Sequence, residues 1–196
     1  MKLLENQWNE VPDGRLLWLP NYFTSDQASD YYQQLQERLA WRQDSIVMFG
    51  KKVAIPRLQA WYGDASYTYS NLKLEPLPWN PLLDSLKAHC EKVAGSQFNS
   101  VLANLYRDGQ DSNGWHSDDE KELGTNPVIA SMSFGAERRF LLRHKMTGEK
   151  MEFNLTSGSL LIMAGETQHH WQHTIPKTKR FVEPRINLTF RKVLVP

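Results

Sequence analysis

Cysteine is almost absent from this sequence: its 196 residues include one, Cys90. A single thiol cannot close an internal disulfide, so a disulfide-stabilised secreted fold is excluded and a reducing compartment is expected. Cys90 falls within a helical pattern of apolar residues, where we expect it to pack in the core. We therefore expect a cytoplasmic protein, or a nuclear one if the source is eukaryotic.

Long apolar runs, repeats and low-complexity linkers are missing as well. No stretch of about 18 apolar residues occurs, so a membrane span is not expected. Residues 1–7 lack the apolar centre and the cleavage site of a signal peptide. With 40% hydrophobic and 23% charged residues, the chain is expected to be a soluble monomer that folds as one domain over residues 1–196.

A large net charge is the third absence. The 23 basic and 22 acidic residues leave a net charge of +1, so the overall field does not favour a nucleic-acid partner. Nucleic-acid binding would have to come from local basic clusters, and two are present, at residues 138–145 and 177–180. Taken alone, either cluster is better explained as a solvated turn.

Two helices are predicted by their capping residues. Thr24 and Gln27 form a capping box before apolar residues at helical spacing, and Asn80 with Pro81 begins a second helix that Gly95 ends. The other apolar segments are short and bounded by turn residues, which is typical of strands. The expected strands are residues 57–62, 100–106, 128–134, 139–143, 151–155, 159–163, 169–175 and 185–191. This pattern favours a mainly β fold of the α+β class, such as a jelly roll, with helices packed outside.

Three residues of the second half suggest a metal site: His116, Asp118 and His173. On a strand His116 and Asp118 would face the same side, and His173 would arrive from a distant strand. Two imidazoles and one carboxylate are the ligand set of a non-haem Fe(II) oxygenase. His-x-Asp alone is a weak signal, a lone histidine is more often a packed or surface residue, and spacing does not choose among His169, His170 and His173.

The last expected strand strengthens this hypothesis. Its polar face carries Arg185, Asn187, Thr189 and Arg191. Arginine binds a carboxylate through two parallel hydrogen bonds. An edge strand with its polar face in water would show the same alternation. Asn104 and Tyr106 share one face of an earlier strand that could line the same cavity. Together these residues predict a site for a 2-oxo acid bound through the metal.

Several motifs in order resemble the AlkB family of Fe(II)/2-oxoglutarate dioxygenases, and within it the AlkB homologue 2 type. The matching segments are residues 56–59, 62–64, 104–109, 116–120, 129–136, 158–161 and 184–191, within a resemblance that runs from about residue 45 to 192. The resemblance implies a double-stranded β-helix (jelly-roll) core. It also implies oxidative demethylation of 1-methyladenine and 3-methylcytosine in single- or double-stranded DNA. In that reaction, 2-oxoglutarate decarboxylation with Fe(II) and O2 is coupled to hydroxylation of the methyl group and release of formaldehyde.

The resemblance also assigns site residues. His116, Asp118 and His173 match the iron ligands, and Arg185 matches the arginine that pairs with the distal carboxylate of 2-oxoglutarate. Arg191 matches a second arginine, near the iron-bound carboxylate. The other matched cosubstrate contacts are Asn104, Tyr106 and Asn187.

Substrate contacts are implied in the same way. The resemblance places Arg57, Tyr67, Tyr69, Asp119 and Glu120 at the base, Phe49 as a wedge that fills the gap left by a flipped base, and Lys177, Lys179 and Arg180 on the DNA backbone. A core contact is an equally good explanation of Phe49, and Thr178 stands where the family has a further basic residue. Residues 1–44 would form an N-terminal extension and helix, 45–75 a nucleotide-recognition region, and 98–193 the catalytic core.

Two alternatives remain at this stage. The first is an oxygenase of the same kind that acts on RNA or on a protein side chain. The second is a non-catalytic β-sandwich binding module with incidental histidines, which would bind no iron and consume no 2-oxoglutarate.

Overall fold

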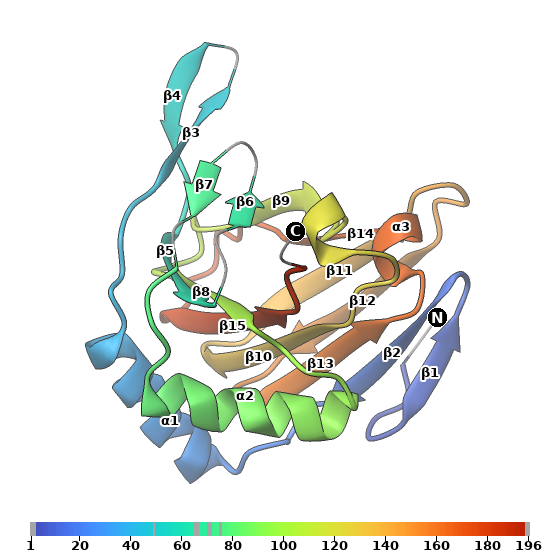
Figure 1. Cartoon of the computed structure of the whole chain (residues 1–196), viewed down its shortest axis with the longest axis horizontal. Helices are drawn as coiled ribbons and strands as arrows, with labels where there is room; N and C mark the ends of the chain where they lie inside the picture. The colour runs from blue at the N-terminus through green and yellow to red at the C-terminus, as the bar shows by residue number, and fades with distance from the viewer. Residues whose placement is uncertain (1–2, 49, 65–66, 70–71, 75, 195–196) are drawn as a thin grey trace.

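Two antiparallel sheets face each other, and two long helices cover the outer face of the larger sheet (Figure 1). The computed structural model of the protein describes residues 3–48, 50–64, 67–69, 72–74 and 76–194. This arrangement confirms the predicted mainly β fold and is consistent with its jelly-roll core.

The larger sheet has seven strands and the smaller has four. In spatial order the larger contains β1 (Trp8–Val11), β2 (Gly14–Leu19), β13 (Ser159–Ala164), β10 (Ile129–Gly135), β15 (Arg185–Arg191), β8 (Ser100–Tyr106) and β5 (Leu58–Gly63). The smaller contains β12 (Lys150–Leu155), β11 (Arg138–His144), β14 (Trp171–Ile175) and β9 (Asn113–His116). Two hairpins stand apart from both sheets in Figure 1: β3 (Ser45–Met48) with β4 (Lys51–Ala54), and β6 (Tyr67–Tyr69) with β7 (Leu72–Leu74).

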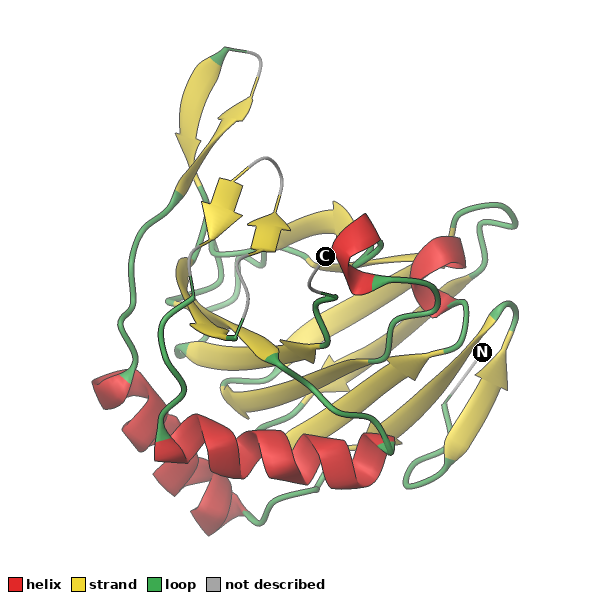
Figure 2. Ribbon diagram, in the orientation of Figure 1, coloured by secondary structure: helices red, strands yellow, loops and turns green. Residues whose placement is uncertain are grey.

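Both predicted helices begin where their capping residues place them. In α1 (Ser25–Arg38) the Thr24 hydroxyl accepts the Gln27 N–H, and the Gln27 side chain accepts the Thr24 N–H. In α2 (Pro81–Ala94) the Asn80 side chain accepts the Leu83 N–H, and Gly95 ends the helix with φ of 62°. Figure 2 shows these two helices on one side of the molecule. The shorter helices are η1 (Lys121–Leu123) and α3 (Thr167–His170).

The core has two apolar layers. Leu35 of α1 and Leu86 of α2 pack with Phe134 against the larger sheet, and Cys90 is fully buried there, which confirms its predicted packing role. Leu161 and Trp171 belong to the second layer, between the two sheets. Burial of each large apolar side chain contributes about 1.5–3 kcal/mol, so these layers hold the sheets in fixed relation. Within the described residues, no helix has the length and apolar character needed to cross a membrane.

The structure corrects three expectations. β15 lies between β10 and β8 with all seven residues buried, so the edge-strand explanation of its polar face is wrong. The strand expected at 169–175 begins only at Trp171, because the preceding residues form the helical turn α3. β9 ends at His116, so Asp118 reaches its position from beyond the strand end and not from a shared strand face.

Candidate metal and cosubstrate site

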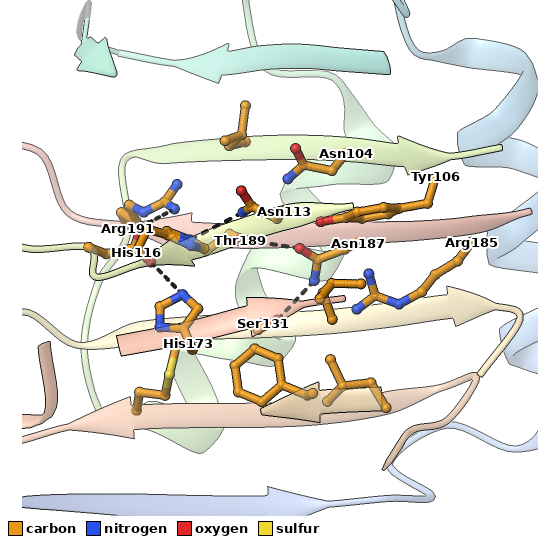
Figure 3. A pocket seen from close by; sticks show the side chains of 16 residues that line it. Asn104, Tyr106, Asn113, His116, Ser131, His173, Arg185, Asn187, Thr189 and Arg191 are labelled. Atoms are coloured by element: carbon orange, nitrogen blue, oxygen red, sulfur yellow. Dashed lines mark hydrogen bonds and ion pairs between the residues drawn. The ribbon is translucent and has the colours of Figure 1, made fainter. Parts of the chain in front are cut away.

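A cavity opens between the two sheets, and polar side chains from both sheets line it (Figure 3). Most of its polar lining comes from β8, β9, β14 and β15. The structure brings all the predicted metal and cosubstrate residues into this one lining: Asn104, Tyr106, His116, Asp118, His173, Arg185, Asn187 and Arg191. Sequence reasoning missed two polar residues of the same lining, Asn113 and Ser131.

His116, Asp118 and His173 form one compact group. One ligand atom from each lies within 4.8 Å of the other two. His116 and His173 are direct partners across the β9–β14 pair, so the strand register alone places the two imidazoles together, with ring centroids 4.2 Å apart. The Asp118 Oδ2 atom lies 4.0 Å from His173 Nε2. These side chains could hold one iron ion through two nitrogens and an oxygen.

The protonation states of the three side chains suit a metal. His116 Nδ1 lies 2.8 Å from the Gly114 carbonyl oxygen, to which it donates, so Nε2 carries the lone pair. Burial and the neighbouring His116 lower the pKa of His173 to about 3, which leaves its imidazole neutral. Burial would raise the pKa of Asp118, but Arg191 and the two histidines lower it to about 2. Neutral imidazoles and an ionised carboxylate are the forms that bind a cation.

Arg191 fixes the orientation of the Asp118 carboxylate. Its Nη2 atom donates to Asp118 Oδ1 at 2.7 Å, and both side chains are buried. The other carboxylate oxygen, Oδ2, is the one that faces His173. Arg191 therefore orients a proposed metal ligand, in addition to lining the cavity where the cosubstrate is expected.

Arg185 is a buried cation that lacks a counter-ion within the described residues. Its Nη2 donates to Ser133 Oγ at 2.9 Å, and the Tyr106 ring centroid lies 5.1 Å from its Cζ atom. Its Nε and Nη1 atoms have no hydrogen-bond partner among the described residues. Burial lowers the pKa of Arg185 to about 10, so the group stays cationic at neutral pH. The unmet N–H groups of this buried, planar cation match a carboxylate, as the distal end of 2-oxoglutarate would supply.

Two amides complete the wall. Asn187 Nδ2 donates to Ser131 Oγ and to the Met132 carbonyl at 2.8 and 2.9 Å. Asn104 Oδ1 accepts from Arg57 Nε at 2.7 Å and from Gln59 Nε2 at 3.0 Å. These bonds fix the orientation of both amides before any ligand binds. Arg57, which the resemblance assigns to substrate binding, is buried and supports the cavity wall through Asn104.

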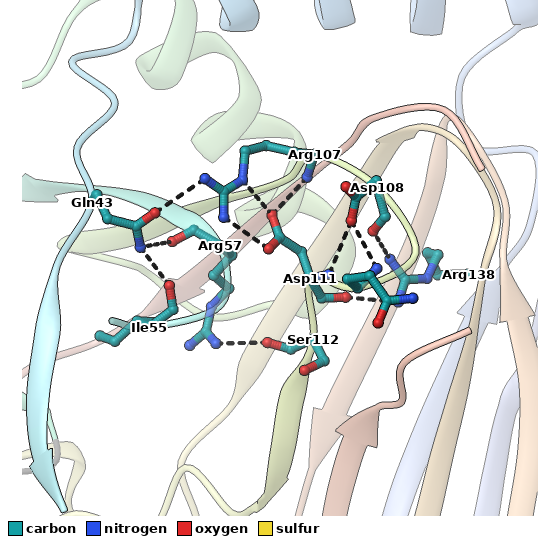
Figure 4. Close-up of polar contacts among 9 residues, drawn as sticks. Gln43, Ile55, Arg57, Arg107, Asp108, Asp111, Ser112 and Arg138 are labelled. Atoms are coloured by element: carbon teal, nitrogen blue, oxygen red, sulfur yellow. Dashed lines mark hydrogen bonds and ion pairs between the residues drawn. The ribbon is translucent and has the colours of Figure 1, made fainter. Parts of the chain in front are cut away.

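A polar network joins this wall to the root of the β3–β4 hairpin (Figure 4). Gln43 donates to the Arg57 carbonyl at 3.2 Å and accepts from Arg107 at 3.1 Å. The Arg107 guanidinium donates to the Asp111 carboxylate at 2.8 and 2.9 Å, and Arg138 donates to the Asp111 carbonyl at 2.9 Å. The hairpin root, the loop after β8 and strand β11 are thus fastened to one another beside the cavity.

Five further residues expected on the substrate side are described by the structure, and none of the five lines this cavity. Phe49 lies outside the described residues, as do the side chains of Tyr67 and Tyr69. Asp119 pairs with His169 and lies 3.8 Å from Lys145 Nζ, and neither Asp119 nor Glu120 is part of the cavity lining. The three basic residues Lys177, Lys179 and Arg180 are exposed on the loop between β14 and β15.

A second histidine–carboxylate group, Asp13, His144 and His170, has ligand atoms within 4.8 Å of one another. His144 Nδ1 accepts the backbone N–H groups of Met146 and Thr147 at 3.3 and 3.1 Å, so Nε2 carries the proton and donates to Asp13 at 2.9 Å. A metal on Nε2 would require a proton on Nδ1, where two N–H groups already point. In this arrangement His144 and Asp13 tie the β1–β2 turn to β11, and His144 offers no free nitrogen lone pair to a metal.

Comparison with known proteins identifies the family. The model of the 2OG-Fe(II) oxygenase superfamily matches residues 15–191. Human alkB homolog 3, an alpha-ketoglutarate-dependent dioxygenase, is 43% identical over 189 residues, which are 91% of this chain and 66% of that protein. Human DNA oxidative demethylase ALKBH2 is 42% identical over 186 residues, covering 88% and 71%, and its Arabidopsis thaliana counterpart is 33% identical over 208 residues, covering 91% and 66%.

The solved structure of OsALKBH1 has a TM-score of 0.62 with 16% identity, over 98% of this chain and all of that chain, which supports the fold alone. The chain spans 66% of the length of the alkB homolog 3 proteins from human and cattle. Fold, site and sequence similarity agree: the chain belongs to the 2OG-Fe(II) oxygenase superfamily and, within it, to the AlkB family.

Proposed function

We propose that this protein removes methyl groups from 1-methyladenine and 3-methylcytosine in DNA, using Fe(II), 2-oxoglutarate and O2. The observation that carries the proposal is one cavity with a His116–Asp118–His173 ligand group and the buried, partly unsatisfied guanidinium of Arg185. The choice of DNA as substrate draws on relatives such as the human DNA oxidative demethylase, 42% identical to this chain.

Iron bound by His116, Asp118 and His173, together with 2-oxoglutarate and O2, supplies the oxidation of a methyl C–H bond to a hydroxymethyl group, which then leaves as formaldehyde. The protein contributes binding and orientation. Arg185 neutralises and orients the distal carboxylate of the cosubstrate through guanidinium N–H groups that have no partner among the described residues. Asn187 and Asn104, already fixed by Ser131 and Arg57, add polar contacts that need no rearrangement.

The loop between β14 and β15 supports a role in DNA binding. Lys177, Lys179 and Arg180 are exposed, and none of them forms an ion pair with an acidic side chain in the described part of the chain. Phe181 follows them with 88% of its surface exposed. Exposed cations that meet phosphates, beside an aromatic ring on which a base can stack, are the two elements of single-strand binding. The roles of Phe49, Tyr67 and Tyr69 remain predictions.

The test is a comparison of substrates under one set of conditions. Protein, Fe(II) and 2-oxoglutarate are mixed without oxygen, then O2 is added with a 3-methylcytosine oligonucleotide, and formaldehyde and succinate are measured. We expect formaldehyde in proportion to lost methyl groups on DNA, and none with the unmethylated strand. Higher turnover on methylated RNA or on a methylated peptide than on DNA would show that DNA is not the preferred substrate. No turnover on any of the three would contradict the proposed demethylase activity.

A further inference from the structure

Asp118 lies where strand pairing has stopped. The pairing of β9 with β14 ends at His116 and His173, so Asp118 has no ladder partner in the described part of that sheet. A metal ligand beyond a strand end needs another restraint on its backbone, because a small shift there displaces the carboxylate.

That restraint comes from α3 and the start of β14. Three consecutive residues are bonded to this segment: Ser117 Oγ donates to the Trp171 carbonyl at 2.8 Å, the Asp118 N–H donates to Gln168 Oε1 at 2.9 Å, and Asp119 pairs with His169. The single turn of α3 thus takes the place of a paired strand.

Gln168 is the buried member of these contacts. It is 1% exposed, whereas the Asp119 and His169 side chains are about a third exposed, where water screens their pairing. Only the amide oxygen of Gln168 can accept the Asp118 N–H, which leaves Nε2 facing Met163 Sδ at 3.5 Å. A buried hydrogen bond of this kind is costly to leave unmade, so it fixes the Asp118 backbone strongly.

We propose that Gln168 is a positioning residue of the metal centre. Its Oε1 fixes the Asp118 backbone, so that Oδ1 remains with Arg191 and Oδ2 stays aimed at the position between the two histidines. The inference rests on the metal centre of the proposed function and is independent of the DNA substrate.

The test uses Mn(II), a redox-inert stand-in for Fe(II), on the full chain without oxygen. Gln168→Met keeps the length and removes the acceptor, Gln168→Asn moves it out of reach, and Gln168→Glu keeps an acceptor oxygen in place. Gln172→Met is the matched control, because Gln172 lies nearby on β14 and bonds to Arg143 at 3.1 Å, away from the cavity. The dissociation constant for Mn(II) and the unfolding temperature of the metal-free protein are measured for each variant.

We expect Gln168→Met and Gln168→Asn to weaken Mn(II) binding about 10- to 100-fold, the loss typical of outer-shell partners, while Gln168→Glu and Gln172→Met bind as the wild type does. A lower unfolding temperature with unchanged Mn(II) affinity in Gln168→Met or Gln168→Asn would make Gln168 purely structural and overturn the proposal. Equal loss in Gln168→Glu and Gln168→Met would assign the effect to packing and overturn it too. A wild-type protein that binds no Mn(II) would contradict the proposed function itself.

Discussion

Arg185 keeps a positive charge inside the protein without a carboxylate beside it in the described residues. Burying an unpaired cation costs free energy of folding. A ligand carboxylate that pairs with Arg185 would explain why the guanidinium is buried there. The Asp118 carboxylate shows the opposite case, since Arg191 pairs it within the chain at 2.7 Å. At the scale of single residues, the metal ligands are therefore already oriented, and the Arg185 guanidinium is available to pair with an anionic cosubstrate.

Replacing Arg185 tests that assignment. Arg185→Lys keeps the charge and loses the planar fork, so it removes one of two parallel bonds to the carboxylate. A charge-assisted bond contributes about 1.5–3 kcal/mol, so the KM for 2-oxoglutarate should rise about 10- to 100-fold. The KM for DNA should change little, and Arg143→Lys, on the outer side of β11 over Trp115, should change neither. An unchanged 2-oxoglutarate dependence in steady-state kinetics would remove Arg185 from the cosubstrate site.

At the scale of elements, the helices and the central strands were predictable because their signals are local. The Thr24–Gln27 capping box and the Asn80–Pro81 pair are both signals of a helix N-terminus. The two helices begin at these residues. The buried polar face of β15 was ambiguous, because the sequence does not say which strands flank it. β15 is a central strand because it pairs with β8 and β10, and both of these are distant from β15 in the sequence.

Other elements were missed for identifiable reasons. The β1–β2 hairpin has a turn signal, Pro12-Asp13-Gly14, but its strands mix charged and apolar residues without regular alternation. β9 has four residues, too few for a pattern. A strand was expected over residues 169–175, yet residues 167–170 turn as α3, where Gln168 accepts the Asp118 N–H and the Thr167 hydroxyl donates to the Ala164 carbonyl. The metal ligands could be proposed from residue types, but the support from Gln168 depends on this turn.

The loop that carries the basic residues is positioned by a glycine. A Cβ atom on Gly109 would lie 2.6 Å from the Thr178 carbonyl oxygen and 3.0 Å from that of Arg180. Both are backbone atoms, so Gly109→Ala must push the loop after β14 away. We expect a loss of about 1–3 kcal/mol in the free energy of unfolding, as for other overpacked sites, and weaker binding of DNA with unchanged binding of Mn(II).

Gly114→Ala is the control for this change, because nothing lies within 4 Å of a Cβ atom placed there. Its free energy of unfolding, measured by denaturant titration, should stay close to the wild-type value. Gly109→Ala could instead prove as stable as Gly114→Ala and bind DNA with normal affinity. The close contact of Gly109 with Thr178 and Arg180 would then not position the loop between β14 and β15.

At the scale of the whole molecule, the net charge of +1 gives no general attraction to DNA. We therefore expect DNA binding to depend on the exposed loop with Lys177, Lys179, Arg180 and Phe181. The contributions of charge and stacking differ in their response to salt, since only phosphate contacts release counterions. Salt dependence can therefore separate the two contributions within one short segment.

Lys179→Ala should lower the slope of log affinity against log salt for a single strand by about 0.7, the value for one lost phosphate contact. Phe181→Ala should leave that slope unchanged. It should make the free energy of binding less favourable by about 1–3 kcal/mol, the contribution of one base stacked on an aromatic ring. Met146→Ala is the control, because Met146 is 83% exposed on a different loop. Fluorescence anisotropy at several salt concentrations measures both quantities. A Phe181→Ala protein indistinguishable from Met146→Ala would exclude a stacking role.

The central claim is that one iron centre, held by His116, Asp118 and His173, demethylates DNA. Asp118→Asn tests it most directly, because asparagine keeps an oxygen for Arg191 and the backbone N–H for Gln168 but loses the ligand charge. The measurement is formaldehyde released from a 3-methylcytosine oligonucleotide in the presence of Fe(II), 2-oxoglutarate and O2. We predict release by the wild type that stops when any of the three is omitted, and none by a folded Asp118→Asn protein. Near-normal release by Asp118→Asn, or release by the wild type without 2-oxoglutarate, would contradict the claim.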